Sequence, residues 1–185
     1  MASAAVTPHT GTGSVLPRLY LIRFVFAAAW AVLLLVSGSD LTAGTKALLF
    51  LYPAFDVAAA VIDAGSTRAG RPVKGLYANM AISALAAVGV AVASTSGTAD
   101  VLRVWGAWAV VSGLVQLLVA VARRPMGGQW AMIASGGISV LAGASFIQSA
   151  SKSDPSLKAL AGYAVLGGIF FLVSAIRLHR STRKD

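Results

Sequence analysis

Six long runs of apolar residues constrain this chain more than any other feature of its sequence. They cover residues 19–36, 46–62, 76–93, 101–122, 129–147 and 157–176. A helix of about 20 residues, rising about 1.5 Å per residue, crosses the hydrocarbon core of a bilayer. The runs are continuous and rich in Ala, Leu and Gly, whereas the strands of a membrane barrel alternate with a period of two. The sequence therefore predicts an all-α polytopic membrane protein with six transmembrane helices.

The composition agrees with a single membrane domain. Only 11% of the 185 residues are charged, against about 25% in soluble proteins. We expect a disordered cytoplasmic tail at 1–17, a six-helix transmembrane domain at 18–177 and a basic cytoplasmic tail at 178–185. The sequence contains no Cys, and its two His are His9 and His179. Disulfides, thiolate catalysis and a His/Cys metal site are thereby excluded, and no metal or cofactor is expected.

The net charge of +9 is distributed unevenly between the two sides of the predicted bundle. Most Lys and Arg fall at the two ends of the chain and in the second and fourth connections, while the other three connections each carry one Asp. The positive-inside rule then places both termini in the cytoplasm, in an inner or plasma membrane. It explains the charge without nucleic acid, and the expected partners are the lipid bilayer and anionic lipid at the cytoplasmic face.

The even-numbered runs repeat one another at steps of 56 and 55 residues. Two sets of positions correspond, namely Tyr52, Trp108 and Tyr163, and Asp56, Ser112 and Gly167. Such a repeat implies three helical hairpins, at about 18–66, 75–124 and 127–178. Each hairpin enters and leaves on the same side, so the three units are parallel and related by an axis along the membrane normal. The lack of inverted repeats weighs modestly against an alternating-access transporter.

Two of the segments resemble a known family. The stretches GAWAVVSGLVQLLVAV (106–121) and GGQWAMIASGGISVLAGASF (127–146), within three hairpin repeats, resemble the HdeD-like membrane proteins. That resemblance implies six helices built from short repeats of unknown function, with no catalytic residues to carry over. The founding member of the family is linked to acid resistance, so a similar role here is an expectation from kinship alone.

Asp56 lies inside an apolar run, where a charge costs at least about 2.5–3.5 kcal/mol on insertion scales. Arg23 falls at a neighbouring depth, so the favoured interpretation is an ion pair of Arg23 with Asp56 or with Asp63. The functional alternative makes Asp56 a proton or cation site. Asp56 could also face a wet vestibule or a subunit interface, or stay protonated because desolvation disfavours its charged form.

Other polar side chains fall near the same depth, notably Asn79, Gln116 and Gln129. With Arg23 and Asp56 they favour either a polar pocket that faces the cytoplasm or, more simply, hydrogen bonds between helices, worth about 0.6 kcal/mol each. Small residues at four-residue spacing predict close helix packing. We expect most aromatic residues to act as depth anchors at the membrane interfaces, including Tyr20, Tyr77, Trp105, Trp108, Trp130 and Tyr163.

These observations favour a non-enzymatic integral membrane protein, and no catalytic residues are expected. Its role would be structural, accessory or part of a stress response, which includes an acid-resistance-like role. The alternative is a small transporter or channel that uses Asp56 as its proton or cation site. A homo-oligomer or a complex with another membrane protein is compatible with both. A membrane enzyme ranks last, because no nucleophile, base and oxyanion donor can be assembled at one depth.

Overall fold

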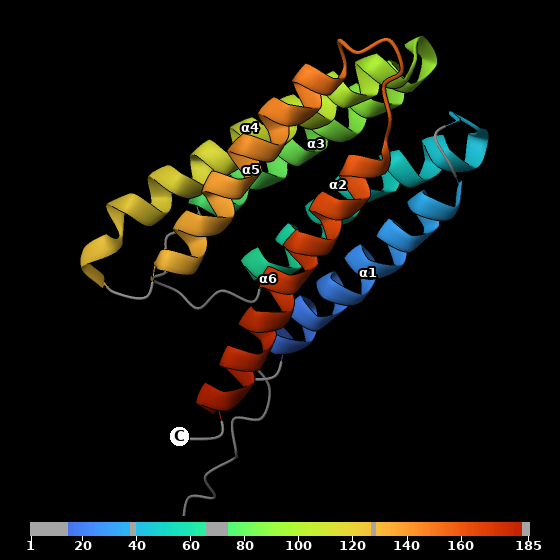
Figure 1. Ribbon diagram of the computed structural model, residues 1–185. Coiled ribbons are helices and arrows are strands. Elements are labelled where there is room, and N and C mark those ends of the chain that lie inside the picture. Colours follow the sequence, from blue (N-terminus) through green and yellow to red (C-terminus); the bar gives the residue numbers. More distant parts are fainter. Residues whose placement is uncertain (1–14, 38–39, 66–73, 127–128, 183–185) are drawn as a thin grey trace, which may run out of the picture.

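The computed structural model describes residues 15–37, 40–65, 74–126 and 129–182. Within these ranges the chain forms six α-helices, one short 3-10 helix and no strand (Figure 1). The elements in chain order are α1 (Val15–Ser37), α2 (Ala43–Gly65), α3 (Lys74–Ser96), α4 (Thr98–Ala122), η1 (Arg124–Met126), α5 (Trp130–Ser149) and α6 (Lys158–Thr182). All six α-helices are long and apolar enough to cross a membrane. The predicted fold class is therefore confirmed.

Two helices extend into the regions that the sequence assigned to tails. α1 begins at Val15 and includes Pro17, which the first turn tolerates because the amide there has no helical partner. α6 continues to Thr182 and ends with His179 and Arg180 in its last turn. Basic side chains are favoured at the negative end of the helix dipole. Both helices therefore reach a few residues into the predicted tails at 1–17 and 178–185. The rest of both predicted tails lies outside the described residues, and their boundaries stay predictions.

The three hairpins close into a ring. The most extensive contacts join α2 to α3, α4 to α5, and α6 back to α1 (Figure 1). Each of these pairs combines the second helix of one hairpin with the first helix of another. Contacts within a hairpin are fewer, and those between α5 and α6 are the fewest. This cyclic pattern agrees with three parallel repeats, each related to the next by the same step.

Glycines bring α4 and α5 into backbone contact. A Cβ added to Gly143 would stand 2.5 Å from the carbonyl oxygen of Gly106, and one added to Gly113 would stand 2.7 Å from that of Gly136. Each helix contributes two glycines seven residues apart, on one face. In lipid, helices associate through such close packing rather than through a hydrophobic drive. The sequence-based prediction of small-residue packing is confirmed at this interface.

The main core fills one half of the bundle. We call the end where α1, α3 and α5 finish the turn end, and the end that carries Arg18, Arg124 and Arg180 the basic end. The buried cluster lies toward the turn end and includes Trp30, Leu34, Leu49, Leu102, Trp105, Phe146, Leu157 and Leu160. This apolar packing closes the turn end of the bundle.

The aromatic residues follow two different patterns. Trp130 and Tyr77 lie at the basic end and are 69% and 57% exposed, as expected of depth anchors. Trp105 is fully buried and stacks on Trp30 with 5.4 Å between ring centroids. Trp108 makes an edge contact with Trp105. The interpretation of Trp105 and Trp108 as interface anchors was therefore wrong, because their helix faces the bundle axis at these positions.

Candidate functional site

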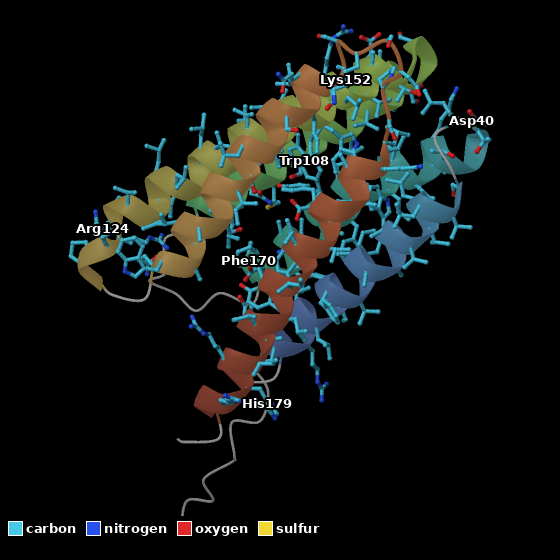
Figure 2. The ribbon with its side chains drawn as sticks, in the orientation of Figure 1. Asp40, Trp108, Arg124, Lys152, Phe170 and His179 are labelled. Carbon is cyan, nitrogen blue, oxygen red and sulfur yellow. The ribbon has the colours of Figure 1, made fainter. Side chains whose placement is uncertain are left out.

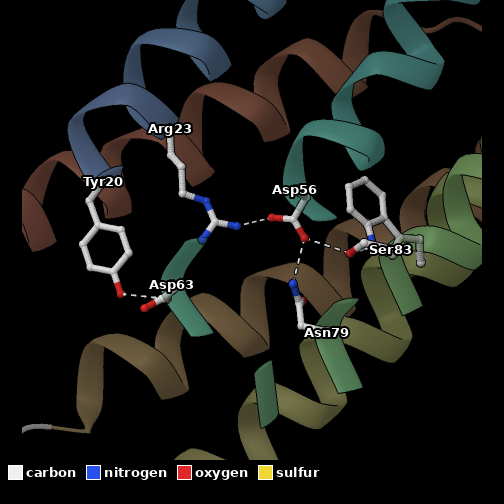
Figure 3. A network of polar contacts seen from close by, with 7 residues as sticks. Tyr20, Arg23, Asp56, Asp63, Asn79 and Ser83 are labelled. Atoms are coloured by element: carbon white, nitrogen blue, oxygen red, sulfur yellow. Dashed lines mark hydrogen bonds and ion pairs between the residues drawn. The ribbon is translucent and has the colours of Figure 1, made fainter. Parts of the chain in front are cut away.

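Asp56 is the centre of a polar network that joins three helices (Figure 3). One carboxylate oxygen pairs with Nη2 of Arg23 on α1. The other accepts a hydrogen bond of 2.8 Å from Nδ2 of Asn79 and another of 2.8 Å from Oγ of Ser83, both on α3. We call Arg23, Asp56, Asn79 and Ser83 the Asp56 clasp. Both oxygens of the buried acid are thus engaged, and its charge is balanced.

Two further helices contact the clasp. Trp108 of α4 donates its indole N–H to Oγ of Ser83 at 3.2 Å. The guanidinium of Arg23 lies over the ring of Phe171 of α6, 4.4 Å from its centroid. Arg23 is only 8% exposed, so its charge is held by Asp56 and by the face of an aromatic ring. The clasp therefore fixes the relative rotation of several helices at one depth.

The tertiary structure distinguishes between the two acids that the sequence offered to Arg23. The ion pair forms with Asp56. Asp63 instead accepts a hydrogen bond of 3.5 Å from the hydroxyl of Tyr20 (Figure 3). The predicted pair of α1 and α2 is confirmed, and Asp56 is its acid.

A cavity of about 610 Å³ occupies the half of the bundle nearer the basic end. All six α-helices contribute to its wall. Its deep end is bordered by Tyr52, Trp108 and Tyr163, and beyond them lies the buried core of the turn end. The other end of the cavity, which we call its mouth, is bordered by Arg123, Gln129 and Arg177. Arg123 and Gln129 lie next to helix termini of the basic end, and Arg177 lies in the part of α6 that approaches this end. The cavity therefore extends from the residues of the basic end to the edge of the buried core.

The cavity coincides with the axis of the threefold repeat. Both sets of corresponding positions found in the sequence line it, namely Tyr52, Trp108 and Tyr163, and Asp56, Ser112 and Gly167. The first helices of the hairpins behave alike, because three positions 56 residues apart also line it: Arg23, Asn79 and Ser135. Sequence reasoning missed this third set, although the same period carried the signal. Equivalent residues thus converge on one central space.

One hydrogen bond is repeated by this symmetry. Trp108 donates to Ser83 at 3.2 Å, and the equivalent Tyr163 donates to Ser139, 56 residues after Ser83, at 2.9 Å. The first repeat has Ala27 at the corresponding position. Aromatic donors on the second helix of two hairpins therefore anchor to serines on the first helix. The deep end of the cavity is held in a fixed shape.

Ser112 lines the cavity at the position that corresponds to Asp56. Its Oγ is buried, and among the residues that the structure describes it has no hydrogen-bond partner. Buried hydroxyls in membrane helices normally find a partner, because an unpaired polar group there is costly. Ser112 is consequently a polar group that a bound molecule or water could satisfy.

The predicted candidates separate into two groups. Five of the six line the cavity, and these are Arg23, Asp56, Asn79, Gln116 and Gln129. Gln116 also donates from Nε2 to the carbonyl of Met132 at 3.0 Å, which joins α4 to α5. The polar pocket and the interhelical hydrogen bonds, treated as alternatives in the sequence, thus occur together. Asp63 does not border the cavity.

The cavity carries an excess of positive charge. Arg23 and Asp56 balance each other, while Arg123 and Arg177 border the mouth. Neither of these two arginines forms an ion pair with an acid among the residues that the structure describes. Within the described ranges, no group of three His, Cys, Asp or Glu is placed to hold a metal ion. The site is therefore built from arginine, amide, hydroxyl and aromatic groups.

Comparisons with protein-family models, with curated proteins and with solved structures found no match for this chain. The resemblance to the HdeD-like proteins therefore stays a prediction. The class that the fold defines is that of a polytopic helical membrane protein. Its site is a cavity on the repeat axis that is lined by both polar and apolar side chains.

Proposed function

We propose that this chain is a non-enzymatic membrane transporter that takes a small solute into the cavity on its repeat axis. The observation that carries the proposal is the cavity of about 610 Å³, walled by all six α-helices, which extends from the basic end to the buried core of the turn end. Solute sites in bundles lie between the helices, and parallel repeats around an axis along the membrane normal occur among transporters. We infer that the cavity opens at the basic end, because the buried core closes the other end. An opening at one end only is the geometry of a carrier in one of its states.

The proposal includes an orientation. The basic end faces the cytoplasm of an inner or plasma membrane, because Lys and Arg concentrate in cytoplasmic connections. Exposed arginines at this end, such as Arg124 and Arg180, would contact anionic lipid. The solute then enters from the cytoplasmic side.

Asp56 has a structural role in this proposal rather than the role of a proton or cation site. Its two oxygens already accept from Arg23, Asn79 and Ser83. A cation at Asp56 would also lie next to the guanidinium of Arg23, which is unfavourable in a medium of low dielectric constant. The clasp instead holds one wall of the cavity in place.

Cysteine accessibility tests the proposal, since the native chain contains no Cys. Ser112→Cys is introduced into the full chain in oriented vesicles and treated with a membrane-impermeant thiol reagent. We expect faster modification from the side of the basic end than from the other side, and some modification from both, because a carrier exposes its site to both sides in turn. Gly167→Leu in the same background should slow both reactions, since it places a side chain in the cavity.

Two matched controls define the result. Ala161 is fully buried in the closed core, so Ala161→Cys should react from neither side. Gly162 lies on the same helix as Gly167 with no atom near its missing Cβ, and Gly162→Leu should leave the labelling of the Ser112→Cys variant unchanged. Absence of labelling from the basic end would contradict the open cavity, and labelling from that end alone would contradict transport.

The second candidate is a structural, accessory or stress-response role, including an acid-resistance-like one. The observation that favours it is the Asp56 clasp, which ties helices together and already engages both oxygens of Asp56. Purification of the tagged protein from its native membrane in mild detergent tests this role. A membrane-protein partner present in stoichiometric amount would favour it over transport, whereas recovery alone or as a homo-oligomer would weaken it.

A further inference from the structure

The unbalanced positive charge of the cavity indicates which solute it accepts. We infer that the cavity binds a small amphiphilic anion, a carboxylate or phosphate attached to an apolar body. This inference rests on the proposed solute-binding function and adds the chemical class of the solute.

Among the residues that the structure describes, three arginines and one acid border the cavity. Arg23 lies deep and is 8% exposed, and Nη2 is the atom through which it pairs with Asp56. A guanidinium has five N–H donors, so a pair made through one nitrogen leaves donor capacity on a group that borders the cavity. Arg123 and Arg177 add two charges at the mouth. Walls of low dielectric constant strengthen the attraction of such a cluster for an anion.

The wall between these arginines is largely apolar. Val115 of α4, Ile138 of α5, and Leu166 and Phe170 of α6 border the same cavity. Figure 2 shows Phe170 and Trp108 beside the space that separates α6 from α4 and α5. A fully hydrated inorganic anion would leave these surfaces without a partner. An apolar or aromatic body on the anion would cover them.

The anion can reach the cavity from two sources that share this chemistry. One is the aqueous phase at the basic end, through the mouth bordered by Arg123 and Arg177. The other is the bilayer, because α5 and α6 have the fewest contacts of any neighbouring pair and both border the cavity with exposed residues, Ala131 and Leu166. A free aromatic carboxylate and an anionic lipid are therefore both used as probes.

Calorimetric titration of the full chain in uncharged detergent at low ionic strength tests the inference. The aqueous probes are indole-3-acetate, indole-3-acetamide and tryptamine, which share one ring system and are anionic, neutral and cationic. The lipid probes are dihexanoyl phosphatidic acid and dihexanoyl phosphatidylcholine. We expect an anionic probe to bind more tightly than its neutral or zwitterionic counterpart, and its affinity to fall as salt is added.

Charge-matched variants locate the binding. Arg123→Gln/Arg177→Gln removes two charges from the mouth, and we expect it to weaken the anion about tenfold, as the loss of two partly exposed charge contacts implies. Arg124→Gln/Arg180→Gln removes the same charge from the same end, but neither residue borders the cavity. That control should leave the affinity unchanged. Gly167→Leu should abolish binding, and Gly162→Leu should not.

The outcomes separate the inference from the proposed function. Binding by indole-3-acetate alone assigns the aqueous source, and binding by phosphatidic acid alone assigns the lipid source. Equal affinity for the anionic and neutral probes, or equal effects of the two arginine pairs, overturns the inference while the cavity still binds a solute. Failure of both anions to bind overturns it as well. The labelling of the Ser112→Cys variant then decides independently whether the proposed transport survives.

Discussion

At the scale of single residues, the most consequential feature is a buried charge that is completely compensated. Arg23 and Asp56 have side chains that are 10% and 18% exposed, and Asn79 and Ser83 both donate to the second carboxylate oxygen of the acid. Removing one member of a buried pair leaves an uncompensated charge, which costs more than the pair contributes. The clasp is therefore sensitive to single substitutions and tolerant of paired ones.

Asp56→Asn should lower the free energy of unfolding by about 2–4 kcal/mol, because Arg23 keeps its charge without a counter-charge. Arg23→Gln/Asp56→Asn should recover most of that loss, since both charges disappear together. Unfolding in mixed micelles, followed by circular dichroism, measures both variants. Asp100→Asn is the matched control, because it breaks the exposed pair of Asp100 with Arg103 and should change stability by less than about 1 kcal/mol. A double variant no more stable than Asp56→Asn would show that Arg23 needs no counter-charge.

At the scale of elements, the backbone contact of α4 with α5 distinguishes glycines that look alike in the sequence. Gly136 and Gly137 are neighbours, yet a Cβ on Gly136 would stand 2.9 Å from the carbonyl oxygen of Gly113, while Gly137 has nothing within 4 Å. Gly106 and Gly143 repeat the close contact nearer the turn end. These glycines set how closely α4 and α5 approach each other. They thereby fix the spacing of the two helices where both border the cavity.

Gly143→Ala should lower stability by about 1–3 kcal/mol, because the added methyl must push two backbones apart. Gly137→Ala should be neutral or should raise stability by up to about 1 kcal/mol, since alanine favours the helix where space is free. Melting temperatures from detergent-solubilised protein compare the two. Equal destabilisation by both substitutions would mean that helix propensity, rather than close packing, governs this interface.

At the scale of the whole molecule, the bundle has a closed half and an open half. The fifteen residues of the buried cluster lie toward the turn end, whereas the cavity occupies the half at the basic end. The few contacts between α5 and α6 make the third hairpin the least constrained part of the ring. Opening of a carrier would therefore require the closed core around Trp105 to separate.

Hydrogen exchange should reproduce this division. Amides of 131–139 and 166–177, which border the cavity, should exchange faster than those of 142–149 and 158–162, because water reaches the first group and the closed core excludes it from the second. Mass spectrometry of the protein in lipid nanodiscs measures the two sets on the same helices. Equal protection of both halves would contradict a water-filled cavity at the basic end.

The sequence by itself determined which segments are apolar enough to lie in lipid, and it predicted the number of repeats. Hydropathy and length are local properties, so the six spans followed directly, and the period that links Tyr52, Trp108 and Tyr163 predicted three parallel units. Only the tertiary structure decided that these three residues meet at the deep end of one cavity, that Arg23 pairs with Asp56 rather than with Asp63, and that Trp105 is buried. Those facts depend on the order and rotation of the helices around the axis. The short polar connections do not encode the order and rotation of the helices. In lipid, this arrangement follows from the close packing of the glycines and from the pairing of buried polar groups.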